Sequence, residues 1–112
     1  MIIAVPLAAG KLAMHFGHCE QFALIEIDES ENKITNRRDI EPPPHEPGLL
    51  PRFLSEQGAG MIIAGGMGRR AQALFSEQGI RVITGAPAET PENLVQACLD
   101  GTLVTGENAC GH

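Results

Sequence analysis

The pattern of apolar and polar positions along the first third of the chain predicts three β-strands. The apolar run at residues 1–5 predicts a buried strand, which Pro6 is expected to end. Residues 21–28 predict a strand with one strongly apolar face, formed by Ala23, Ile25 and Ile27, and an opposite face formed by Phe22, Leu24 and Glu26. The mostly polar residues 33–40 predict a return strand near a sheet edge, so the two strands form a hairpin.

Helical spacing appears after a proline-rich loop at 41–48. Helices are predicted at 49–57 and 69–78, with Gly58 and Gly79 directly after them, and each precedes a short apolar strand, at 61–64 and 80–84. The last helix has the clearest beginning, because Thr90 can cap it, Pro91 suits its first position and Glu92 suits its first turn. Gly101 is expected to end it.

This order of elements predicts an α/β fold with a mixed five-stranded sheet flanked by helices. Successive helix–strand units give parallel strands with right-handed crossovers. A chain of 112 residues fits a single domain, here residues 1–112, and residues 106–112 are expected to form a flexible tail.

Composition excludes several classes of protein. The net charge of −6 and the presence of only two lysines argue against nucleic-acid binding. No apolar run approaches the roughly 20 residues that cross a bilayer, and no basic segment precedes the first strand, so we expect no membrane span, no signal peptide and a cytoplasmic location. Three cysteines, an odd number, do not indicate a disulfide framework.

Candidate chemistry is concentrated in an expected loop, His15-Phe16-Gly17-His18-Cys19. Two imidazoles and a thiol within five residues are typical ligands of soft or borderline metals, so His15, His18 and Cys19 are predicted metal ligands. The structural alternative is that Cys19 is a half-buried residue at the start of a strand and that the histidines bond to backbone or water.

Two further loops are expected to converge on this one. His45 follows three prolines and is a fourth predicted metal ligand, or else simply an exposed histidine. The turn Gly65-Gly66-Met67-Gly68 joins a strand to a helix, where backbone N–H groups and the helix N-terminus attract anions, and Arg69 follows at once. The alternative is a tight turn with solvated arginines and with Met67 packed in the core.

The two other cysteines have different surroundings. Cys98 shares the apolar face of the last helix and is predicted to belong to the core. Cys110-Gly111-His112 places a thiol and an imidazole two residues apart on the expected tail, where they either capture a metal or form an unstructured end.

The ordered set of these pieces resembles the dinitrogenase iron–molybdenum cofactor biosynthesis family, the NifX and NifB C-terminal type of domain, especially its stand-alone members of the orange-protein type. The resemblance is carried by residues 1–5, the His15–Cys19 loop, the 22–28 strand, His45 after prolines, residues 61–68, and Ala86-Pro87 before the last helix. It implies a ribonuclease H-like fold without nuclease activity. It also implies that the His15–Cys19 loop, His45 and Gly65–Gly68 form the binding surface.

The resemblance and the loops together predict a non-catalytic carrier or scaffold for a metal–sulfur cluster, molybdenum with iron or copper, or for a cofactor precursor. Its partners would be cluster donor and acceptor proteins, and the chain would be a monomer or a weak homodimer. The alternative is an anion- or nucleotide-sensing module that uses the turn from Gly65 to Arg70. Catalysis is not expected, because the crowded carboxylates are at the predicted hairpin, away from the loops; they are Asp28, Glu29, Glu31 and Asp39.

Overall fold

Strand β1 (Ile2–Ala8) lies at the centre of a mixed sheet in the computed structural model, which describes residues 1–16, 19–43 and 48–106. It pairs antiparallel with β3 (Gln21–Asp28) and parallel with β5 (Ala59–Ile63). The edges are β4 (Lys33–Ile40), which forms the predicted hairpin with β3, and β6 (Arg81–Ile83), which is parallel to β5. Along the main path the order is β4-β3-β1-β5-β6.

The expected count of five strands is wrong, because the described residues form a sixth strand, β2 (Lys11–Leu12), which pairs with the end of β1. Ala9 and Gly10 between the two strands have φ of 53° and 80°. Positive φ at both central residues is what a tight two-residue hairpin turn requires. A strand of two residues is too short to show any hydrophobic period, so the sequence pattern could not reveal it.

The expectation that Pro6 ends the first strand is also wrong, since β1 continues to Ala8. The Pro6 carbonyl accepts a hydrogen bond from the N–H of Ala13, on the side of the strand away from β3. The proline nitrogen faces that same side, beyond Ala4, the last β1 residue in register with β5. The proline therefore removes no hydrogen bond from the described β1–β5 register, which ends at Ala4.

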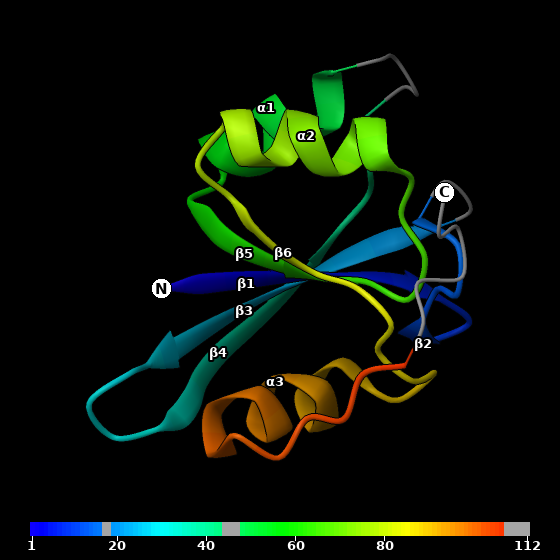
Figure 1. Cartoon of the computed structure of the whole chain (residues 1–112). Coiled ribbons are helices and arrows are strands. Elements are labelled where there is room, and N and C mark those ends of the chain that lie inside the picture. The colour runs from blue at the N-terminus through cyan, green and yellow to red at the C-terminus, as the bar shows by residue number, and fades with distance from the viewer. Residues whose placement is uncertain (17–18, 44–47, 107–112) are drawn as a thin grey trace.

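Three helices form in the described ranges, and Figure 1 shows α1 (Leu49–Glu56) and α2 (Arg69–Glu77) on one face of the sheet and α3 (Pro91–Asp100) on the other. Their positions confirm the predicted helices. Gly58 and Gly79 have positive φ directly after the C-caps of α1 and α2, and Gly101 has it at the C-cap of α3. None of these helices within the described residues is long and apolar enough to cross a membrane.

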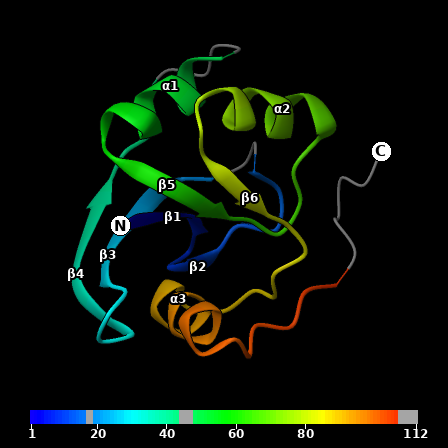
Figure 2. The same ribbon diagram turned by 60° about the vertical axis from the view of Figure 1, so that its left-hand side comes forward.

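The alternation of β3 divides the core into two clusters, one on each face of the sheet. Phe22 and Leu24 pack on the face covered by α1 and α2, with Leu54 and Phe75. The opposite side chains pack on the face covered by α3, with Leu94 and Val95; they are Ala23, Ile25 and Ile27. Figure 2 shows the sheet between these two helical layers. Both faces of β3 are therefore buried from Phe22 to Ile27, except at Glu26.

The strand directions bring the candidate loops to one end of the molecule. Strands β1, β4, β5 and β6 all run in the same direction, so they end at a common border, which we call the carboxyl edge. In Figure 1 this edge lies on the right, where α2 and α3 begin. The residues after β1, the turn after β5 and the segment after β6 therefore lie at the same end of the sheet.

Candidate functional site

Two of the predicted loops meet at the carboxyl edge through backbone hydrogen bonds. The Gly66 N–H donates to the carbonyl of Met14 at 2.8 Å, and the Phe16 N–H donates to the carbonyl of Gly66 at 2.9 Å. His15 lies between these two bonds, in parallel register with Gly66. The expected convergence of the His15 loop and the glycine turn is therefore confirmed for their described residues.

Phe16 fixes this loop to the core beneath α2. Its side chain is only 9% exposed, and its ring makes a T-shaped contact with Phe75 at a centroid distance of 5.5 Å. Phe22 lies on its other side, with ring centroids 6.1 Å apart. Because Phe16 points inward, its neighbour His15 is left exposed at the surface.

Cys19 is half-buried just before β3 and packs against the cluster under α1 and α2. Burial raises the pKa of its thiol above the ordinary value, because the charged thiolate loses solvation. Without a metal the thiol is therefore protonated at neutral pH, and a metal that binds it must displace the proton. Cys19 therefore lies where the alternative interpretation expects it, half-buried at the start of a strand. Its role as a metal ligand stays a prediction.

The glycine turn is closely packed against the loop. A Cβ atom at Gly65 would lie 3.0 Å from the carbonyl oxygen of Met14, so only glycine allows this approach without a shift. The Gly66 N–H is already bonded to Met14 and is not available for an anion. Met67 is 1% exposed and belongs to the core cluster under α2, which fits the packing interpretation of its side chain.

The beginning of α2 remains open to an anion. Its N-cap is Gly68, which has no side chain to accept from the first-turn N–H groups, and the described first turn contains no acidic residue. Arg69 and Arg70 are exposed at this position. Unpaired N–H groups and a positive helix end stabilise a bound anion by about 0.3–1 kcal/mol at an exposed site.

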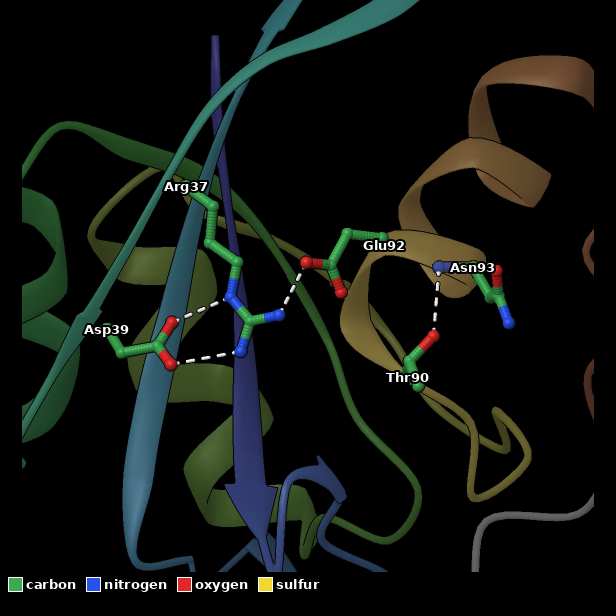
Figure 3. Close-up of polar contacts among 5 residues, drawn as sticks. All are labelled: Arg37, Asp39, Thr90, Glu92 and Asn93. Carbon is green, nitrogen blue, oxygen red and sulfur yellow. Dashed lines mark hydrogen bonds and ion pairs between the residues drawn. The ribbon is translucent and has the colours of Figure 1, made fainter.

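The N-terminus of α3, on the opposite face of the sheet, already has a side-chain cap and a carboxylate beside its positive end. Thr90 accepts a hydrogen bond from the Asn93 N–H, and Glu92 occupies the first turn (Figure 3). The Glu92 carboxylate is held by Arg37, whose hydrogen bond is the largest cause that lowers the pKa of Glu92. The two faces therefore differ, and an anion is favoured on the face of α1 and α2.

Several predicted site residues lie outside the described residues, namely Gly17, His18 and His45, together with Cys110 and His112 of the predicted tail. Within residues 1–16, 19–43 and 48–106, no three His, Cys, Asp or Glu side chains come together in a way that could hold a metal ion. The described part of the site therefore supplies His15 and Cys19 as candidate ligands but not a complete set.

Two of the four crowded carboxylates, Asp28 and Asp39, make structural contacts. Asp28 accepts hydrogen bonds from the N–H and hydroxyl of Ser30 and from the N–H of Glu31, which closes the hairpin turn and lowers the pKa of Asp28. Asp39 is paired with Arg37 on β4. Asp28 lies where β3 ends, at the opposite end of the sheet from the carboxyl edge.

Sequence reasoning missed Gly85 and Gly106, which complete the carboxyl edge. The Gly85 N–H donates to the Gly65 carbonyl and the Gly106 N–H to the Gly85 carbonyl, each at 2.7 Å. Gly85 has φ of 78°, a conformation that side chains rarely adopt. The only sequence signal was a glycine directly after a predicted strand, which is equally typical of an ordinary turn.

The family model of the dinitrogenase iron-molybdenum cofactor matches residues 1–101 of the chain. The protein belongs to this family. The family indicates a cofactor-binding role connected with the iron–molybdenum cofactor. The match extends through the whole of α3 and so includes all the described helices and strands, although it ends before Gly106.

Individual relatives match the chain over nearly its whole length. The chain is 32% identical over 108 residues to an uncharacterized protein of Methanocaldococcus jannaschii, MJ0580, a match that covers 92% of this chain and 89% of the relative. The crystal structure of PH0822 superposes with a TM-score of 0.85 at 30% identity and covers 94% of both chains. The apo form of the orange protein from Desulfovibrio gigas shares the fold, with a TM-score of 0.72 at 23% identity over 96% of this chain and 93% of that one.

Proposed function

We propose that this protein binds a metal–sulfur cluster, molybdenum with iron or copper, or a cofactor precursor, at the carboxyl edge and passes it on without catalysing a reaction. The observation that carries the proposal is the contact between Gly66 and the residues on either side of His15. It supports the proposal because His15, a candidate ligand, is in register with Gly66, which precedes the N-cap of α2, Gly68. Soft ligands and a positive helix end in one place suit an anionic sulfide cluster.

The difference in charge between the start of α2 and the start of α3 also supports a site at the start of α2. The α3 side has an internal carboxylate, Glu92, at its helix start, whereas α2 begins with Gly68 and two arginines. A metal–thiolate or metal–imidazole bond contributes far more than a helix end, since structural zinc sites total on the order of 10–16 kcal/mol. Direct ligands in the loop would therefore set the affinity, and the helix end would favour the charge of the cluster.

Several finer features remain part of this proposal. They are the ligands His15, His18, Cys19 and His45, a cytoplasmic location, donor and acceptor proteins as partners, and a monomeric or weakly dimeric state. The ribonuclease H-like assignment also stays a prediction, supported by a mixed sheet with an antiparallel half, β4-β3-β1, and a parallel half, β1-β5-β6.

The decisive experiment is to measure metals and acid-labile sulfide in the protein purified anaerobically from its native host. Molybdenum together with iron or copper, and labile sulfide, are expected. The protein with His15→Gln and Cys19→Ser should lose this content, whereas Lys33→Gln, at the opposite end of the sheet, should retain it. Wild-type protein that contains zinc alone, or a double variant that retains the full cluster, would contradict the proposed site.

An anion- or nucleotide-sensing role is the second candidate, and the open start of α2 favours it. The glycine turn does not offer a full phosphate cradle, because the Gly66 N–H is bonded to Met14. A rise in melting temperature with nucleotides, but none with a thiomolybdate anion, would select this function over the cluster carrier.

A further inference from the structure

A groove runs along α3, between this helix and the segment that follows it. Its floor is formed by Leu94 and Ala97 of the helix, and its wall by Leu103 and Val104 of the following segment. It has a volume of about 320 Å³, and Glu89 lines the end where α3 begins. Figures 1 and 2 show the segment after α3 returning beside the helix toward the carboxyl edge. The groove therefore leads to the edge that carries the proposed site.

The segment that forms the wall is held at both ends by backbone hydrogen bonds. The N–H of Leu103 donates to the carbonyl of Ala97 at 3.2 Å, and the N–H of Gly106 donates to the carbonyl of Gly85 at 2.7 Å. Between these anchors, residues 104 and 105 make no backbone hydrogen bond within the described part of the chain. Open N–H and carbonyl groups beside an apolar groove can pair with an extended peptide, as the edge of a sheet does.

The wall also exposes apolar surface. Val104 is 80% exposed, whereas the other large apolar side chains exposed among the described residues, Met1 and Met14, are 43% and 45% exposed. Leu94 in the floor is 1% exposed and already belongs to the core. Covering Val104 with another apolar group would remove its surface from water, which favours association.

The charge beside the groove is negative. No lysine or arginine follows Arg81 in the sequence, so the lining residues between 87 and 104 contain no cation. The Glu89 carboxylate forms no ion pair or hydrogen bond with any other described residue. Leu12 of β2 donates its N–H to the Glu89 carbonyl, but its neighbour Lys11 alternates away from the α3 face, on which Leu12 is buried. This charge favours lysine or arginine in the occupant of the groove.

We propose that this groove binds an extended basic segment of a partner protein, with an apolar side chain against Val104 and a lysine or arginine beside Glu89. The open backbone groups at 104 and 105 favour an extended segment over a helix. The net charge of −6 disfavours a second copy of this chain as the occupant. The inference rests on the proposed function only in that the partner would lie beside the edge from which the cluster is passed on.

The test is an NMR titration of the isotope-labelled full-length protein with a short acetylated peptide of alternating lysine and valine. Saturable shifts are expected at the backbone amide signals of Leu103, Val104 and Thr105, with slower hydrogen exchange at the last two. Matched peptides of alternating glutamate and valine, or of alternating lysine and serine, should bind at least about 10-fold more weakly. No saturable binding of the first peptide below about 1 mM, or equal binding of all three, overturns the proposal.

Two variants with matched controls test the contacts. Glu89→Gln should weaken binding of the lysine–valine peptide by about 2- to 5-fold at low ionic strength, whereas Glu77→Gln removes the same charge from α2 and should not. Val104→Ser should weaken it by about 3- to 10-fold because less apolar surface is buried, whereas Thr105→Ser should not. Glu89 and Val104 are exposed, so neither change should unfold the protein. Unchanged binding by either groove variant overturns the proposal.

Other occupants would give different results. A variant that ends at Gly106 should bind the peptide like wild type. If it binds at least about 10-fold more tightly, residues 107–112 compete for the groove and the proposal is overturned. Shifts of the same amide signals with protein concentration alone, together with a dimer in sedimentation, would identify a second copy as the occupant and would also overturn it.

These outcomes are distinguishable from a failure of the proposed function. Tetrathiomolybdate should bind Val104→Ser as it binds wild type, and the peptide should bind His15→Gln with Cys19→Ser as it binds wild type, because the two sites share no side chain. A protein that binds the peptide but no thiomolybdate would contradict the cluster carrier and leave the docking groove supported. A protein that binds thiomolybdate but not the peptide would contradict the groove alone.

Discussion

Arg37 on the edge strand β4 reaches across to Glu92 in the first turn of α3, with Nη1 of the guanidinium 2.5 Å from Oε2 of the carboxylate (Figure 3). Asp39 holds the other side of the same guanidinium, through Nε–Oδ1 at 2.8 Å and Nη2–Oδ2 at 2.9 Å. The bridge joins residues 55 positions apart in the sequence. It fixes the start of α3 to the sheet and supplies the negative charge that this helix end favours.

Replacing Glu92 by glutamine should destabilise the fold only modestly at neutral pH. The side chains of Arg37 and Glu92 are 30% and 45% exposed, so solvent screens the pair and its contribution should be less than about 1 kcal/mol. The free energy of unfolding from denaturant titration measures the change. Glu77→Gln, an exposed glutamate near the end of α2, serves as the control and should have a smaller effect.

The same pair predicts the sign of an acid effect. The pKa of Glu92 is lowered in the folded protein, chiefly by the hydrogen bond from Arg37, whereas an unfolded glutamate titrates at about 4.3. Its contribution is therefore complete above that value and is lost as the pH falls through the lower folded pKa. Unfolding measured between about pH 3 and 7 should show the wild-type and Glu92→Gln curves converging toward acid. A gap that widens toward acid would contradict this origin.

Local patterns were sufficient to predict most of the fold. The pattern of residues 21–28 predicted a strand with one strongly apolar face, although the structure buries both faces, and Thr90-Pro91 predicted the start of α3. Strand β2 and the continuation of β1 through Pro6 could not be predicted, because both depend on which chain segment faces each backbone group. Hydrogen bonds between chain segments distant in sequence leave no periodic signal.

In the candidate site, too, the residue types could be predicted from the sequence, whereas contacts between distant segments could not. The candidate ligands of the His15 loop and the glycine turn were visible as residue types, and the convergence of the two segments followed from parallel strands. The inward direction of Phe16 was not visible, because a short loop has no period. The backbone contact between Gly85 and Gly106 could not be predicted either. Nothing in the local sequence distinguishes a glycine that allows a close backbone approach from one in an ordinary turn.

Substituting Gly85 by alanine should be costly, whereas the same change at Gly106 should be nearly neutral. Alanine at 85 meets both a φ of 78° and the Gly106 backbone, which together should cost about 1–3 kcal/mol. Alanine at 106 has only an ordinary contact at 3.9 Å. Thermal or denaturant unfolding of the two variants tests the contact between Gly85 and Gly106 directly. Equal stability of the two would mean that residues 85 and 106 do not meet in solution.

Replacing Phe16 by alanine should loosen the loop that bears His15. The lost ring leaves space between Phe22 and Phe75, and a buried Phe→Ala change typically costs about 3–5 kcal/mol. Phe16→Leu keeps most of the apolar volume and should cost less. Hydrogen exchange should show faster exchange at the Gly66 and Phe16 N–H groups in the alanine variant. Unchanged protection at both groups would show that the ring does not hold the loop.

Removing the two arginines at the start of α2 should weaken the binding of a thiomolybdate anion through charge alone. Arg69→Gln with Arg70→Gln should lower the affinity by about 3- to 10-fold at low ionic strength, and the difference from wild type should shrink as salt is added, because exposed charges are screened within about 10 Å at 0.1 M. Lys33→Gln and Arg81→Gln together remove the same charge from the amino ends of β4 and β6 and should leave the affinity unchanged. An equal loss in both double variants would indicate a nonspecific effect of net charge. A loss that persists at high salt would indicate direct contacts with the arginine side chains, beyond the charge effect expected for the open start of α2.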